Sequence, residues 1–222
     1  MKKLVLSILL LLGLVTNSYA TGSVGFTLSN ADINSDVSDD IDSNGTTNTT
    51  RSLKNDVTFA SIFFEKALND NMSVGIDFIP FEAEFESRST TQQSTKAKAA
   101  GAAPQTSGTN KGTADVSNHL TFYLQPQKEI RDGLKVFGTL GLVKADVESV
   151  VTSISSTDKT VDQSLDGTKL GIGLKKETGI GFIKLEYSET DYDEVSVTTG
   201  NSTKVSADID TDVLALSVAK SF

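Results

Sequence analysis

The sequence has 222 residues, a formal net charge of −9 and no cysteine, and 37% of its residues are hydrophobic. This length suits one domain, the acidic balance argues against nucleic acid as a partner, and the missing cysteines exclude disulfides and thiolate metal sites. The composition indicates neither a disordered chain nor a dense soluble core.

The N-terminus has the features of a secretory signal peptide. Two lysines precede an apolar stretch at residues 4–15, and small residues follow at Ser18 and Ala20. We expect cleavage after Ala20, which separates a signal peptide at 1–20 from the mature domain at 21–222. The alternative is an uncleaved anchor, but the apolar stretch is shorter than the roughly 20 residues that span a bilayer.

Beyond the signal peptide, apolar and polar side chains alternate in segments of about ten residues, as in strands with one face in lipid. Eight segments are expected, and in the second, residues 56–66, phenylalanine occurs on both faces, so its facing is ambiguous. In chain order, the other apolar faces are Val24, Phe26 and Leu28; Met72, Val74, Ile76 and Phe78, continued past a bulge at Pro80 by Phe81, Ala83 and Phe85; Val116, Leu120, Phe122 and Leu124; Leu134, Val136, Leu140 and Leu142; Leu170, Ile172 and Leu174; Ile183, Leu185 and Tyr187; and Leu214, Leu216, Val218 and Phe222.

The connections between these segments alternate in length, which is typical of barrels with short periplasmic turns and long external loops. We therefore expect an all-β fold, an eight-stranded antiparallel up-and-down transmembrane β-barrel. The short connections are at 68–71, 126–133 and 176–179, and the long polar ones are at about 32–55, 87–114, 148–165 and 190–206.

In pattern, signal and terminus, the mature chain resembles the small OmpA/OmpX-like outer-membrane β-barrel proteins. The resemblance implies that Leu214, Leu216, Val218 and Phe222 are read by the barrel-assembly machinery, although Lys220 departs from the usual aromatic or apolar residue. It also implies a monomer in the Gram-negative outer membrane, with membrane lipid and lipopolysaccharide around it. The alternative is a soluble periplasmic β-sandwich or lipocalin-like barrel, which would be apolar inside and polar outside.

An eight-stranded barrel has an interior that side chains can fill, whereas water-filled channels need about 16 strands. The inward faces carry charges of both signs, which we expect to pair and close the lumen. A narrow porin-like channel for small solutes is the alternative. The expected lumen charge network is Asp77, Glu82, Glu84, Lys135, Lys169, Lys175, Lys184 and Glu186.

His119 is the only histidine, and we expect it to face inward beside Ser117 and Thr121. Histidine and serine serve catalysis in lipid-modifying barrel enzymes, the third alternative. Residues two apart on a strand lie roughly 6 to 7 Å apart, too far for a direct hydrogen bond between Ser117 and His119. We therefore expect no enzyme, no catalytic residue and no cofactor.

Acidic clusters near the expected loops raise the question of divalent cations. Residues 40–45 match the first half of a calcium loop, but the twelfth position is Arg51 instead of a bidentate glutamate. Asp208, Asp210 and Asp212 are expected above the membrane, where they are either solvated or hold cations against lipopolysaccharide phosphates. We expect no metal site, and a non-enzymatic protein with a structural or surface-interaction role through its long polar loops.

Overall fold

The computed structural model describes residues 22–40, 47, 49–80, 83–92, 108–153, 156–198 and 204–222. These residues form antiparallel strands in a single sheet. The strands are β1 (Gly22–Asp40), β2 (Thr49–Asn69), β3 (Met72–Ile79), β4 (Ala83–Gln92), β5 (Gly108–Arg131), β6 (Leu134–Ser153), β7 (Ser156–Glu177), β8 (Gly181–Tyr192), β9 (Val195–Thr198) and β10 (Lys204–Ser221).

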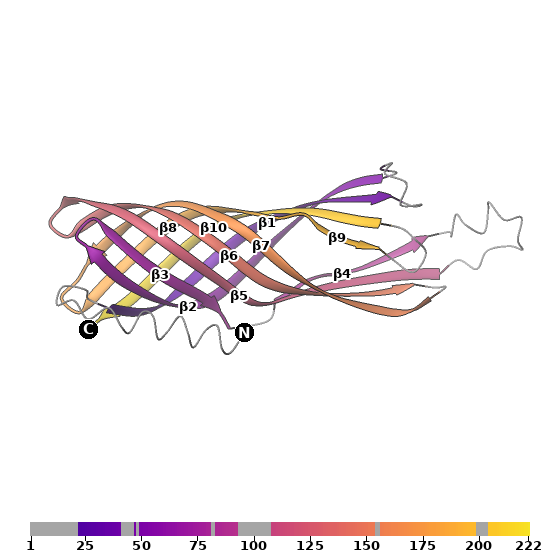
Figure 1. Ribbon diagram of the computed structural model, residues 1–222, viewed down its shortest axis with the longest axis horizontal. Coiled ribbons are helices and arrows are strands. Elements are labelled where there is room, and N and C mark those ends of the chain that lie inside the picture. Colours follow the sequence, from indigo (N-terminus) through magenta and orange to yellow (C-terminus); the bar gives the residue numbers. More distant parts are fainter. Residues whose placement is uncertain are drawn as a thin grey trace, which may run out of the picture.

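The sheet closes on itself because β1 pairs with β10, with Phe26 opposite Val218 and Asp36 opposite Asp208. β3 and β4 both pair with β5, and β8 and β9 both pair with β10. Each of these pairs occupies one strand position, so the closed barrel has eight positions. Figure 1 shows the tilted strands, with the C-terminus at one end and β4 and β9 at the other. The prediction of an eight-stranded antiparallel barrel is confirmed.

Pro80 separates β3 from β4, as the expected bulge implied. Ile79 lies opposite His119 and Ala83 opposite Val116, so this side of the ladder has one residue more than β5. Proline has no N–H to donate to the ladder, which accounts for the interruption at this point.

The hairpin after β5 is tighter than the connection expected at 126–133. β5 continues to Arg131, and a two-residue turn, Asp132-Gly133, leads into β6. Both turn residues have positive φ, 41° and 75°, the backbone that two-residue hairpins require. The expectation was wrong because the polar residues before the turn were assigned to a loop, whereas Glu129 pairs with Lys135 in the ladder.

A belt of apolar side chains surrounds the barrel near its short-turn end, the end that carries Asp70, Gly133 and the C-terminus. Phe26 is 64% exposed and Leu142 68%, while the inward Thr27 and Thr139 are buried. This arrangement, apolar outside and polar inside, is the pattern of a barrel in lipid. The described residues include no helix long and apolar enough to span a membrane.

Beyond this belt the strands continue, and the chemistry of their two faces is exchanged. On β1, Ile33 is buried inside the barrel, whereas Asp32 and Asp36 face outward. Val147 and Leu165 are likewise buried. The expectation of long polar loops at 32–55, 87–114, 148–165 and 190–206 is therefore wrong for much of each range, because the strands continue there as hydrogen-bonded ladders. These ladders form two groups, β9, β10, β1 and β2 in one and β4 to β7 in the other.

One expected facing on β5 is also wrong. Val116 was placed on the lipid face with Leu120, but it lines the interior. The ladder between β5 and β6 shifts register between Ser117 and Leu120, and Asn118 within this stretch has φ 52°. Such a bulge reverses the facing of the residues on one side of it, so Val116 and His119 both line the lumen.

Candidate functional site

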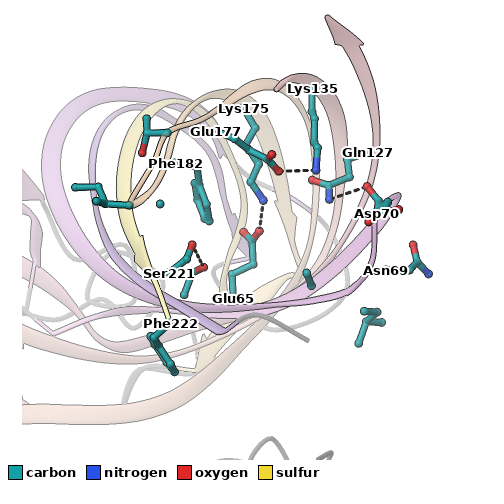
Figure 2. A pocket seen from close by; sticks show the side chains of 17 residues that line it. Glu65, Asn69, Asp70, Gln127, Lys135, Lys175, Glu177, Phe182, Ser221 and Phe222 are labelled. Carbon is teal, nitrogen blue, oxygen red and sulfur yellow. Dashed lines mark hydrogen bonds and ion pairs between the residues drawn. The ribbon is translucent and has the colours of Figure 1, made fainter. Parts of the chain in front are cut away.

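The interior of the barrel at the level of the apolar belt is crossed by one carboxylate shared by two lysines. Glu65 on β2 accepts hydrogen bonds of 2.7 Å from Lys175 Nζ on β7 and of 2.7 Å from Lys184 Nζ on β8, one on each oxygen. The three side chains are between 2% and 6% exposed. Figure 2 shows Lys175 and Glu65 pointing toward each other inside the ring of strands.

The Lys184 ammonium also lies within a set of aromatic rings, whose faces attract a desolvated cation. Phe63 and Phe182 pack against each other with ring centroids 6.1 Å apart. The distances from Lys184 Nζ to the ring centroids are 4.6 Å for Phe63, 5.3 Å for Tyr123, 5.4 Å for Phe182 and 5.8 Å for Phe137. This lysine is thus held by both a carboxylate and the rings.

Gln125 joins this ion pair to a second one. Its Oε1 accepts a hydrogen bond from Lys184 Nζ at 3.4 Å, and its Nε2 donates to Thr139 Oγ1 at 3.0 Å and to Glu186 Oε2 at 3.4 Å. Glu186 pairs with Lys169 at 2.9 Å. Buried polar groups in such a continuous network compensate one another's desolvation.

Two inward glycines provide the space that the rings occupy. A Cβ at Gly75 would collide with the ring of Tyr123, and one at Gly173 would collide with the ring of Phe137. Side chains from several strands therefore meet across the lumen. We call this layer the partition; it consists of Phe63, Glu65, Tyr123, Gln125, Phe137, Lys175, Phe182 and Lys184.

The partition separates two hollows. On its short-turn side is a polar vestibule of about 670 Å³, whose lining includes Glu65, Lys175 and Asp70 (Figure 2). On its other side is a chamber of about 460 Å³, whose lining includes Lys184 and Tyr123 and continues into the aliphatic part of the barrel. Glu65 has one carboxylate oxygen bonded toward each side.

No protein-family model matches the sequence, and no curated protein matches it. Solved structures do match. The outer-membrane protease OmpT from Escherichia coli matches at a TM-score of 0.50 and 7% identity over 93% of this chain and 98% of the other. Ail from Yersinia pestis, in complex with a heparin analogue, matches at 0.38 and 13% over 87% and 98%, and neisserial surface protein A at 0.39 and 10% over 89% and 97%.

Three observations bear on the fold of this chain. They are the closed sheet, the apolar belt on its outer face and the match to OmpT. This chain has the fold of the small eight-stranded outer-membrane β-barrels. At these identities the likeness says nothing about residue roles.

The predicted lumen charges are placed at different heights in this barrel. Lys169, Lys175, Lys184 and Glu186 lie in or beside the partition. Lys135 pairs with Glu177 in the vestibule (Figure 2). Asp77 lines the chamber and accepts a 2.8 Å hydrogen bond from Ser61 Oγ. Glu82 lies outside the described residues, and for Glu84 only the backbone, opposite Asp115 in the ladder, is described.

Glu65 was missed by the sequence analysis although it is the centre of the partition. The facing of residues 56–66 was ambiguous because Phe63 and Phe64 occupy opposite faces. A signal was present, since Ser61 and Glu65 share one face while Ile62 and Phe64 share the other. Phe63 obscured it, because an inward phenylalanine is unexpected in a polar lumen.

His119 lines the chamber, but it is not arranged as a catalytic base beside Ser117. Its Nε2 lies 3.0 Å from the Tyr192 hydroxyl, and Ser117 lies opposite Asp146 in the ladder. His119 is thus paired with a tyrosine hydroxyl and not with Ser117.

The C-terminal residues complete the barrel. Leu214, Leu216 and Val218 belong to the outward belt, each more than half exposed. Phe222 exchanges backbone hydrogen bonds with Gly22, at 2.9 Å and 3.2 Å, and its ring lies 6.3 Å from that of Phe64. The residues proposed as an assembly signal thus also close the sheet between first and last strands.

Acidic side chains form a row just beyond the belt. The ladder places Asp212 opposite both Glu189 and Asp32, and Asp32 opposite Asp56. The Tyr187 hydroxyl donates to Asp212 at 2.6 Å. Among the described residues, no group of three or more acidic or histidine side chains is arranged to hold a metal ion. Residues 41–46, most of the expected half calcium loop, lie outside the described part of the chain.

Proposed function

We propose that this protein is a non-conducting integral protein of the outer membrane, with a structural or surface-interaction role outside the bilayer. The observation that carries the proposal is the partition, in which Glu65 is paired with Lys175 and Lys184 and all three are buried. An eight-stranded barrel is narrow enough for side chains to fill. A lumen filled in this way leaves ions no continuous aqueous path.

The interaction surface in this proposal is the part of the barrel beyond the apolar belt. Strands such as β5 (24 residues) and β7 (22 residues) are far longer than the roughly 9 to 11 residues that cross a bilayer. Their outer faces there are polar and acidic, as Asp32 and Asp36 on β1 show. The protein thus presents long polar strands to the outside, in place of loops alone.

Export and insertion follow from the same proposal. The signal peptide at 1–20, cleaved after Ala20, would direct the chain to the periplasm, and Leu214, Leu216, Val218 and Phe222 would be read by the barrel-assembly machinery. The mature barrel would lie as a monomer among outer-membrane lipid and lipopolysaccharide. Mass spectrometry of the mature N-terminus and membrane fractionation test this; an uncleaved chain in the inner membrane would contradict it.

Planar-bilayer recordings of the purified full-length mature protein test the closed lumen. We expect no stable conductance from the natural sequence. The triple variant Glu65→Ser, Lys175→Ser and Lys184→Ser removes the shared charges together, so no buried ion is left unpaired, and it should conduct. The matched control is Lys144→Ser with Asp166→Ser, which removes a half-exposed pair outside the barrel.

A stable, reproducible conductance from the natural sequence would contradict the proposal and favour the narrow channel. If neither the natural protein nor the triple-serine variant conducts, this result would also count against the partition as the element that closes the lumen. Heat-modifiable gel mobility, checked for every variant, ensures that each recording comes from folded protein.

A further inference from the structure

The chamber above the partition differs from the polar vestibule, because most of the surface of its walls is apolar. Ile33, Val57, Val147, Leu165 and Ile209, from five different strands, line it. The outer faces of the same strands are polar at this height, as at Asp32 and Asp56. Apolar walls of this kind exclude water and favour an apolar occupant.

The charges at the floor of the chamber compensate one another. Lys184 is paired with Glu65 and Lys169 with Glu186, and Asp77 is bonded to Ser61. A charged ligand entering here would lose its hydration without gaining an unpaired partner. The floor therefore favours an uncharged molecule.

One neutral polar pair lies on the chamber wall. His119 Nε2 and the Tyr192 hydroxyl are 3.0 Å apart, and His119 Nδ1 is buried without a hydrogen-bond partner in the described part of the chain. The Tyr192 ring lies close to Gly167, where a Cβ would come within 2.8 Å of the ring. Buried polar atoms are nearly always satisfied, so this pair marks where a polar group of an occupant would bind.

We propose that the chamber binds one uncharged, mainly apolar small molecule that carries a single hydrogen-bonding group such as a hydroxyl. Its volume of about 460 Å³ falls in the roughly 300 to 1,000 Å³ range of small-molecule sites. The apolar part of the ligand contacts the aliphatic walls, and its polar group bonds to His119 and Tyr192. This activity goes beyond the closed-lumen role and does not depend on whether the partition conducts.

The sequence contains no tryptophan, so one introduced tryptophan is the only indole emitter. Phe59→Trp places it in the chamber wall, and Thr58→Trp places it on the outer face one residue away, where Thr58 is exposed. The probe is 4-bromophenol, a neutral ring with one hydroxyl whose bromine quenches indole fluorescence. The full mature protein is titrated with it in lipid nanodiscs.

We expect saturable quenching of Phe59→Trp and only linear quenching of Thr58→Trp, which senses probe outside the barrel. Adding Ala207→Phe, which fills the chamber from a half-buried lining position, should abolish the saturable part, whereas Ala207→Ser should keep it. His119→Ala should weaken the saturable binding severalfold without changing heat-modifiable mobility.

Linear quenching of both tryptophan variants would overturn the proposal. If Ala207→Phe fails to fold, a crystal structure of the natural sequence soaked with 4-bromophenol decides. Bromine density in the chamber supports the site, and its absence there contradicts it.

Discussion

Glu65 on β2 and Lys184 on β8 are 119 residues apart in the chain and meet at 2.7 Å inside the barrel. Neither strand pairs with the other in the sheet, since β2 lies between β1 and β3 and β8 between β7 and β10. The contact therefore reaches across the lumen. It forms only when the barrel is closed, which makes it a marker of the folded state.

Replacing Glu65 by glutamine should destabilise the barrel strongly. Lys175 and Lys184 would both remain buried without a counter-ion, and breaking a buried pair on one side costs about 3 to 5 kcal/mol. The free energy of unfolding, measured by urea titration in lipid vesicles, should fall by about this amount. Glu177→Gln is the control, because Glu177 is about half exposed and such pairs contribute only about 0 to 1 kcal/mol. Equal losses in the two variants would contradict the account.

Gly75→Ala tests the packing of the partition. The new methyl would collide with the Tyr123 ring and would lie 2.7 Å from the Phe64 carbonyl oxygen. Overpacking of this kind costs about 1 to 3 kcal/mol. Gly179→Ala is the matched control, because nothing lies within 4 Å of a Cβ there. Thermal unfolding followed by gel mobility should separate the two variants, and an unchanged midpoint for Gly75→Ala would show that the ring is not confined.

The edge of the apolar belt is tested by two lysine substitutions on the outer face of β10. Leu216→Lys places a charge in lipid and should lower the free energy of unfolding by about 2 to 4 kcal/mol. Asp212→Lys lies beyond the belt beside the acidic Asp32 and Glu189, so it should cost little or stabilise the barrel. Vesicle unfolding experiments compare them. A penalty at Asp212 as large as at Leu216 would place the lipid boundary higher than the belt indicates.

The acidic row gives the barrel a pH dependence of known sign. The pKa of Asp32 is raised above its ordinary value of 3.8, mainly by the hydrogen bond to Asp56 and the repulsion between the two carboxylates. The folded state therefore binds a proton more readily than the unfolded state. Its stability should fall as pH rises from 3.8 through the raised pKa. Asp32→Asn should therefore have a higher midpoint of unfolding than the natural sequence at pH 7. In acid, the two midpoints should no longer differ in this way.

Asp70→Asn, in the exposed turn at the other end of the barrel, serves as the control for the acidic row. It should leave the midpoint unchanged at both pH values. A midpoint of Asp32→Asn equal to that of the natural sequence at pH 7 would show that the row is not strained by repulsion.

The barrel and the direction of most of its side chains could be predicted from the sequence, because the two-residue period is a local signal. A stretch of five residues is enough to infer that Phe26 and Leu28 face outward and that Thr27 faces inward. The facing of Val116 could not be predicted, since it depends on the bulge at Asn118. No alternation pattern shows where such an extra residue is inserted.

The partition was only half predictable for a different reason. Lys175, Lys184 and Glu186 stand out because they alternate with leucine and isoleucine on their own strands. Glu65 follows two phenylalanines, Phe63 and Phe64, that face opposite ways, and its role depends on β7 and β8, which no local pattern connects to β2. The inward aliphatic side chains beyond the belt, such as Ile33 and Leu165, were assigned to loops because polar residues surround them there.

The most direct test of the account is the environment of single spin labels along the outer face of β1. The chain has no natural cysteine, so Phe26→Cys, Leu28→Cys, Asp32→Cys and Asp36→Cys each give one site. In lipid vesicles, labels at positions 26 and 28 should be relaxed by oxygen and shielded from a water-soluble nickel complex. Labels at positions 32 and 36 should show the reverse. Access to the nickel complex at all four positions would contradict a membrane-spanning barrel.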